Sequence, residues 1–126
     1  LLMIKHALAD FYFQGRLLGG GDENKLLSKK KNRHALDHAI GTAFVFFLVL
    51  SVTHDMTMII PWICLFSFAI LDYVLHLLID WRKNIITKKY KWKVSDRQFW
   101  KLTAIDQCAH YSCYILYCWL FANYWL

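Results

Sequence analysis

Ionisable side chains recur at four-residue steps inside the most apolar parts of this chain. The stretch FSFAILDYVLHLLID, residues 66–80, is otherwise apolar and carries Asp72, His76 and Asp80. Residues four apart lie on one face of a helix. An ionisable side chain that faces lipid costs at least ~2.5–3.5 kcal/mol at membrane depth. The pattern therefore predicts helices whose polar faces are turned towards one another.

The hydropathy of the chain indicates a membrane protein with a single domain over residues 1–126. Of its 126 residues, 58% are hydrophobic, whereas soluble domains are about half apolar. Apolar segments cover about residues 1–18, 34–52, 58–80 and 98–126, and a span needs roughly 20 such residues. Backbone groups in lipid must be satisfied within each segment, which only helices achieve here. We expect an all-α integral membrane four-helix bundle.

The basic residues predict how this bundle is oriented. The formal net charge is +6, and most Lys and Arg residues fall in two blocks between the apolar segments. Basic loops stay on the cytoplasmic side of a membrane. We therefore expect loops 19–33 and 81–97 to be cytoplasmic and both termini to lie outside. Runs such as KKKNR (residues 29–33) are explained by this topology, so we expect no nucleic-acid partner.

Every predicted helix carries at least one pair of His or Asp residues at four-residue spacing, and the pairs fall at a similar depth near the cytoplasmic edge. Histidine nitrogen together with carboxylate oxygen is a ligand set for zinc, iron or manganese. We expect one or two divalent ions, zinc first, with Gln14 and Gln107 orienting ligands or water. The candidate metal ligands are His6, Asp10, His34, His38, Asp72, His76, Asp106 and His110.

Two other interpretations of these pairs remain open. Polar side chains can hold membrane helices together by hydrogen bonds alone. Buried Asp and His residues also mark proton and ion paths. Both interpretations use the same residues and the same inward-facing arrangement.

Four motifs resemble a domain-of-unknown-function family of small membrane proteins in bacteria and their phages. The resemblance extends over nearly the whole chain and implies a bacterial or phage source and an inner-membrane location. It implies no activity. The motifs are HALADFYFQ (6–14), HALDHAIGT (34–42), LDYVLHLLIDWRK (71–83) and DQCAHY (106–111).

Three functions fit these features. The first is a metal-dependent hydrolase that acts on a lipid or its headgroup at the cytoplasmic leaflet, with Asp37 or Asp80 as general base; a redox di-iron enzyme would use the same ligands. The second is a metal-ion or proton transporter or channel, to which a homo-oligomer could contribute. The third is a non-catalytic membrane interaction protein with a structural polar cluster. In each case the basic loops would contact anionic lipid headgroups.

Overall fold

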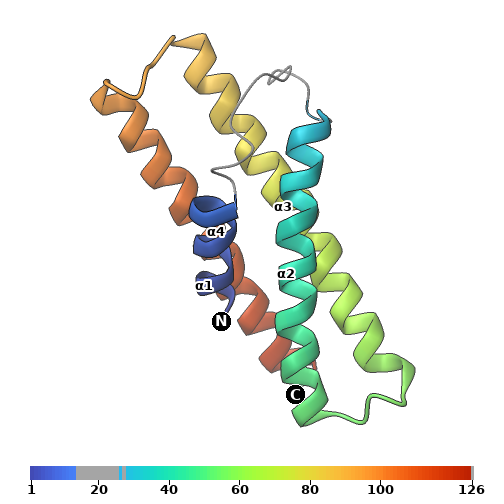
Figure 1. The fold of residues 1–126 in the computed structure, drawn as a ribbon. Coiled ribbons are helices and arrows are strands. Elements are labelled where there is room, and N and C mark those ends of the chain that lie inside the picture. The colour runs from blue at the N-terminus through green and yellow to red at the C-terminus, as the bar shows by residue number, and fades with distance from the viewer. Residues whose placement is uncertain (14–25, 27, 126) are drawn as a thin grey trace.

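Three long helices and one short helical segment make up the fold (Figure 1). A computed structural model describes residues 1–13, 26 and 28–125, and these residues contain no strand. Helix α1 (Leu2–Ala7) continues into a π-helical turn, η1 (Leu8–Phe13). The long helices are α2 (Lys29–Thr53), α3 (Ile59–Lys89) and α4 (Arg97–Tyr124). The prediction of an all-α chain with four helices is confirmed.

The long helices run antiparallel, and α1 lies against α2 and α4 (Figure 1). The start of α2, the end of α3 and the start of α4 share one end of the molecule. We call this the basic end, because it carries the Lys and Arg residues of 29–33 and 82–97. The turn at residues 54–58 and the end of α4 lie at the opposite end.

The helices extend further into the basic segments than the predicted bounds. Helix α2 begins at Lys29 rather than at residue 34, and the Ser28 hydroxyl caps it by accepting a hydrogen bond from the Lys31 N–H at 3.4 Å. Helix α3 continues nine residues beyond residue 80, so the predicted loop 81–97 is largely helical. Lys and Arg are good helix formers, and cations near a helix C-terminus are favoured by its dipole. Residues 14–18 of the first predicted helix lie outside the described residues.

Tight turns join the long helices. Between α3 and α4 the chain reverses at Lys91, which has a positive φ of 55°. Between α2 and α3, the backbone N–H and hydroxyl of Thr57 donate to Asp55 Oδ1 at 2.9 and 2.8 Å. Both hydrogen bonds lower the pKa of the exposed Asp55 carboxyl, and the backbone bond lowers it more. This turn contains no lysine or arginine.

An apolar core fills the bundle on the side of the 54–58 turn. The rings of Phe46 and Phe68 stack with centroids 4.4 Å apart, and Phe121 meets Phe46 edge-on at 5.4 Å. Leu50 and Tyr117 are fully buried beside them. These residues join α2, α3 and α4 into one packed unit.

Large apolar side chains also cover the outside of the long helices. Ile40 and Phe44 on α2 and Phe66 and Ile70 on α3 each have more than half of their surface exposed. By length and composition, α2 and α3 could each cross a membrane.

Two phenylalanines on α3 allow a matched test of this packing. Phe68 is 4% exposed and Phe66 is 56% exposed. Phe68→Ala should lower the free energy of unfolding by about 3–5 kcal/mol, as is typical for a buried phenylalanine, and Phe66→Ala should change it little. Denaturant titration of the purified variants measures both values. Equal losses for the two variants would contradict this packing of α3.

Candidate metal centre

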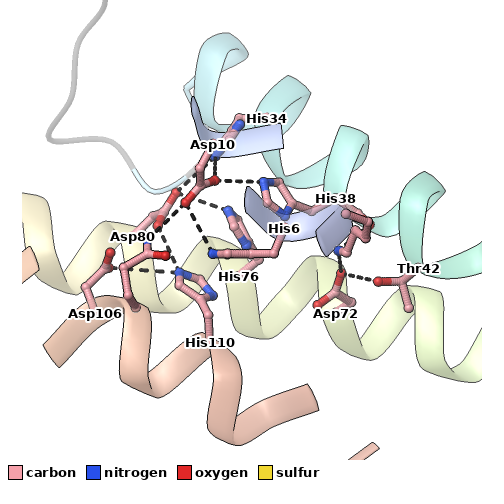
Figure 2. A network of polar contacts seen from close by, with 12 residues as sticks. His6, Asp10, His34, His38, Thr42, Asp72, His76, Asp80, Asp106 and His110 are labelled. Carbon is pink, nitrogen blue, oxygen red and sulfur yellow. Dashed lines mark hydrogen bonds and ion pairs between the residues drawn. The ribbon is translucent and has the colours of Figure 1, made fainter. Parts of the chain in front are cut away.

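Eight buried or partly buried His and Asp side chains from every helical segment meet near the basic end of the bundle (Figure 2). Helix α1 and η1 provide one pair, and α2, α3 and α4 provide one pair each. We call this set the His–Asp cluster. Its members are His6, Asp10, His34, His38, His76, Asp80, Asp106 and His110.

The four-residue spacing places both members of each pair on the inward face of its helix. In α3, His76 Nε2 lies 3.3 Å from Asp80 Oδ2. In the first segment, His6 Nε2 lies 3.2 Å from Asp10 Oδ2. Asp10 belongs to η1, and single π-helical turns occur frequently at functional sites. The π-helical turn η1 thus carries Asp10, one of the two carboxylates of the cluster that contact several histidines.

Asp10 connects its own segment to α2 and α4. Its Oδ1 atom lies 3.0 Å from His38 Nε2 and 3.3 Å from His34 Nε2. Its Oδ2 atom accepts a hydrogen bond from Gln107 Nε2 at 3.0 Å. The predicted role of Gln107 in orienting a ligand is therefore compatible with its position. Gln14 lies outside the described residues.

Asp80 connects α3 to α2 and α4, much as Asp10 connects the first segment to them. Its Oδ1 atom lies 3.3 Å from His110 Nε2, and its Oδ2 atom lies 3.8 Å from His34 Nε2. Asp80 is also the most exposed carboxylate of the cluster, with 23% of its side chain accessible, against 12% for Asp10 and 3% for Asp106. It is thus the carboxylate of the cluster that solvent reaches most readily.

Several nitrogens in the cluster have no hydrogen-bond partner. Within the described part of the chain, both ring nitrogens of His38 and of His76 are buried without one, as is Nε2 of His6. Some of these atoms lie within 3.3 Å of a carboxylate oxygen, but not in hydrogen-bond geometry. Buried polar atoms are normally satisfied, so these lone pairs and protons need another partner.

The spacing of the donor atoms fits a metal ion as that partner. Donor atoms about 2.0–2.2 Å from a tetrahedral zinc ion are about 3.3–3.6 Å apart. Three overlapping groups have all their ligand atoms within 4.8 Å of one another. One group joins Asp10 to three histidines, and His76 is shared between two of the groups. The groups are Asp10, His34, His38 and His76; His6, His76 and His110; and Asp80, Asp106 and His110.

Asp72 lies next to the cluster but belongs to none of these groups. Its Oδ2 atom accepts hydrogen bonds from the Thr42 hydroxyl at 2.6 Å and from Lys5 Nζ at 2.8 Å. Lys5 Nζ also donates to the His38 carbonyl at 2.9 Å. Gly41 gives this lysine room, because a Cβ there would lie 2.9 Å from Lys5 Cδ. Asp72 thus joins α1 and α2 to α3 through hydrogen bonds. This differs from its predicted role as a metal ligand.

The remaining candidates are placed in different surroundings. Asp37, predicted as a general base, is exposed on α2 and belongs to none of the ligand groups. Asp106 Oδ2 pairs with Lys83 Nζ at 2.9 Å, and its Oδ1 lies 3.9 Å from His110 Nε2. His54 lies in the 54–58 turn, at the far end from the cluster.

Sequence reasoning missed the residues that support the cluster. Tyr114 donates to or accepts from His6 Nδ1 at 2.9 Å, depending on the tautomer of the imidazole. Lys5 and Thr42 pair with Asp72. The available signals were a lysine inside an apolar segment and a tyrosine four residues after His110, on the same helix face.

Comparison with known proteins identifies the family. The model of a family described as "Protein of unknown function (DUF3307)" matches residues 1–125, so the chain belongs to this family. No match was found among curated proteins or among solved structures.

The Lys5–Asp72 pair can be tested apart from the cluster. Removing one member of a buried ion pair typically costs about 3–5 kcal/mol, so Lys5→Met should lower the free energy of unfolding by about that amount. The double variant Lys5→Met/Asp72→Asn should recover most of the loss, because no charge is left unpaired. Denaturant titration measures each value, with the exposed Lys101→Met as control. Additive losses in the double variant would show that the two residues do not interact.

Proposed function

We propose that this member of the DUF3307 family is an integral membrane protein of the bacterial inner membrane, with its basic end in the cytoplasm. The support is that the side chains are distributed in the opposite way to those of a soluble protein. Charged and polar residues are buried in the His–Asp cluster, whereas large apolar residues such as Phe44, Ile70 and Ile115 are exposed on the long helices. Lipid would cover this exterior.

The length of α3 agrees with this placement. Its 31 residues extend about 46 Å at ~1.5 Å per residue, whereas a bilayer core is about 30 Å thick. The surplus falls at the basic end, where Arg82, Lys83, Lys88 and Lys89 are located. These residues would reach the cytoplasmic headgroups, and both chain termini would face the outside.

We further propose that the His–Asp cluster binds one or two divalent metal ions, zinc first, with iron or manganese as alternatives. The observation that carries this proposal is the set of buried histidine nitrogens that point into the cluster without a hydrogen-bond partner in the described residues. A hydrogen-bonded network would leave fewer such atoms. Asp10, whose two oxygens lie near three histidines, would be the central carboxylate ligand.

The chemistry that fits such a centre is hydrolysis of a lipid ester or phosphodiester. A bound zinc ion lowers the pKa of a coordinated water towards neutrality. Asp80 is best placed to accept the proton, because it is the most accessible carboxylate. Water activated at this site would form a bond to the phosphorus or carbonyl carbon as the ester bond breaks, and Asp80 would pass the proton to the leaving alkoxide oxygen. Gln107 would hold Asp10 in orientation.

Transport through a single chain is less compatible with the packing. Between the cluster and the 54–58 turn, the interior is filled by Phe46, Leu50, Phe68 and Phe121. The described residues of this core are mostly apolar and offer few ligands for an ion that leaves the cluster. The hydrolase proposal needs access only from the basic end.

Metal content is the first test of the centre. Protein purified in detergent should contain about one or two equivalents of zinc, iron or manganese, measured by inductively coupled plasma mass spectrometry. His76→Ala should lose most of the metal, since His76 is shared by two ligand groups, whereas His54→Ala should keep it. Lipid hydrolysis by the reconstituted protein, followed by mass spectrometry of extracted lipids, should fall in parallel.

Two results would contradict this proposal. A folded wild-type protein that neither contains nor takes up these metals would leave a hydrogen-bond network as the explanation. A metal-loaded protein that hydrolyses no inner-membrane lipid would indicate a structural metal.

The orientation can be tested by cysteine labelling. In a background in which the four native cysteines are replaced by serine, Thr57→Cys should react with a membrane-impermeant maleimide from the outside of intact spheroplasts. Lys91→Cys should react only in inverted vesicles, because the basic end would be cytoplasmic. Labelling of both positions from the same side would contradict the proposed topology.

A further inference from the structure

A narrow groove of about 270 Å³ lies between α3 and α4 at the basic end of the bundle. Its walls are mostly apolar, with Leu78 and Ile86 from α3 and Ile105 and Ala109 from α4. Two cations, Arg82 and Lys83, also line it. Binding sites for small molecules usually combine such apolar walls with a few polar groups.

The walls of the groove are almost wholly apolar, and the lining residues include more cations than acids. Asp106 is its one acidic lining residue, and Lys83 Nζ lies 2.9 Å from Asp106 Oδ2. Arg82 is exposed beside this pair. A planar guanidinium binds phosphate oxygens in a bidentate manner, which suits an anionic phosphate ester.

One member of the His–Asp cluster, Asp106, also lines the groove. Asp106 Oδ2 faces Lys83 in the groove, while its Oδ1 lies 3.9 Å from His110 Nε2. His110 in turn contacts Asp80 Oδ1 at 3.3 Å. A molecule in the groove would therefore contact the cluster at Asp106, which Figure 2 shows beside His110.

We propose that this groove binds an anionic phospholipid of the cytoplasmic leaflet and presents its phosphate to the cluster. The phosphate would sit against Arg82 and Lys83, and an acyl chain would lie along Leu78 and Ile105. This inference rests on the proposed function for the reaction, but binding of the lipid itself needs no metal. It assigns the substrate class of the hydrolase as an anionic, not a zwitterionic, phospholipid.

The apolar walls and the two cations together select this occupant. A soluble phosphate would gain nothing from Leu78, Ile86 and Ile105, and a neutral lipid would gain nothing from the excess positive charge. A cation at an anionic membrane surface contributes about 1 kcal/mol per residue. Loss of Arg82 should therefore weaken selective binding of an anionic lipid about fivefold.

The test is competition between two lipids of matched chain length. Purified protein in detergent is mixed with equal amounts of phosphatidylglycerol and phosphatidylcholine, and native mass spectrometry measures the ratio of the two bound forms. Wild type should prefer phosphatidylglycerol, and Arg82→Gln should reduce the ratio about fivefold. Lys101→Gln, an equal change of charge at an exposed position on α4 outside the groove, should leave the ratio unchanged.

A second pair of variants tests the walls of the groove. Ala109→Phe should fill the space and reduce binding of both lipids, whereas Ala104→Phe, at an exposed position outside the groove, should not. The proposal is overturned if Arg82→Gln and Lys101→Gln reduce the ratio equally, since the preference would then reflect net charge alone. It is also overturned if Ala109→Phe binds phosphatidylglycerol as wild type does.

Measurements on metal-free protein, prepared with a chelator, separate this inference from the proposed function. Selective binding that survives chelation supports the groove whether or not the cluster is catalytic. Metal binding without lipid selectivity would retain the metal centre and reject the groove as the lipid site.

Discussion

The arrangement of the helices depends on the pairing of buried charges between them. Lys5 meets Asp72 across α1 and α3, and Lys83 meets Asp106 across α3 and α4. A buried charge without a partner is costly, so rotation of either helix in a pair would be opposed by several kcal/mol. These pairs fix which face of each helix is turned inward.

This constraint explains how so short a segment as α1 keeps its place. Six residues bury little apolar surface, and an isolated helix of this length is not stable. Its Lys5 reaches Asp72 and the His38 carbonyl, and its His6 reaches the Tyr114 hydroxyl. Polar contacts to three helices therefore hold a segment that apolar packing alone would hold poorly.

The interior has two halves with different chemistry. Near the basic end it is filled with imidazoles and carboxylates, and near the 54–58 turn it is filled with phenylalanine and leucine. Tyr114 belongs to both halves, because its ring is part of the apolar core and its hydroxyl contacts His6. A tyrosine suits such a boundary, since one end is apolar and the other forms a hydrogen bond.

The inward faces could be predicted from the sequence, because four-residue spacing determines a helix face whatever the tertiary structure. The partners across helices could not, since spacing says nothing about which neighbours face each other. Asp72 has the same spacing as His76 and Asp80, yet it pairs with Lys5. Helix α3 ends at Lys89 rather than at the predicted residue 80 for another reason. The charges of residues 82–89 favour a loop, although lysine and arginine form helices readily.

The residues at positions 5, 41 and 72 depend on one another, although they are far apart in the sequence. Helix α2 lacks a side chain where the stem of Lys5 passes on its way to Asp72. A larger residue at position 41 would push the stem of Lys5 aside, and a shorter residue at 5 could no longer neutralise an acid at 72. We therefore expect the residues at these three positions to vary together across the family.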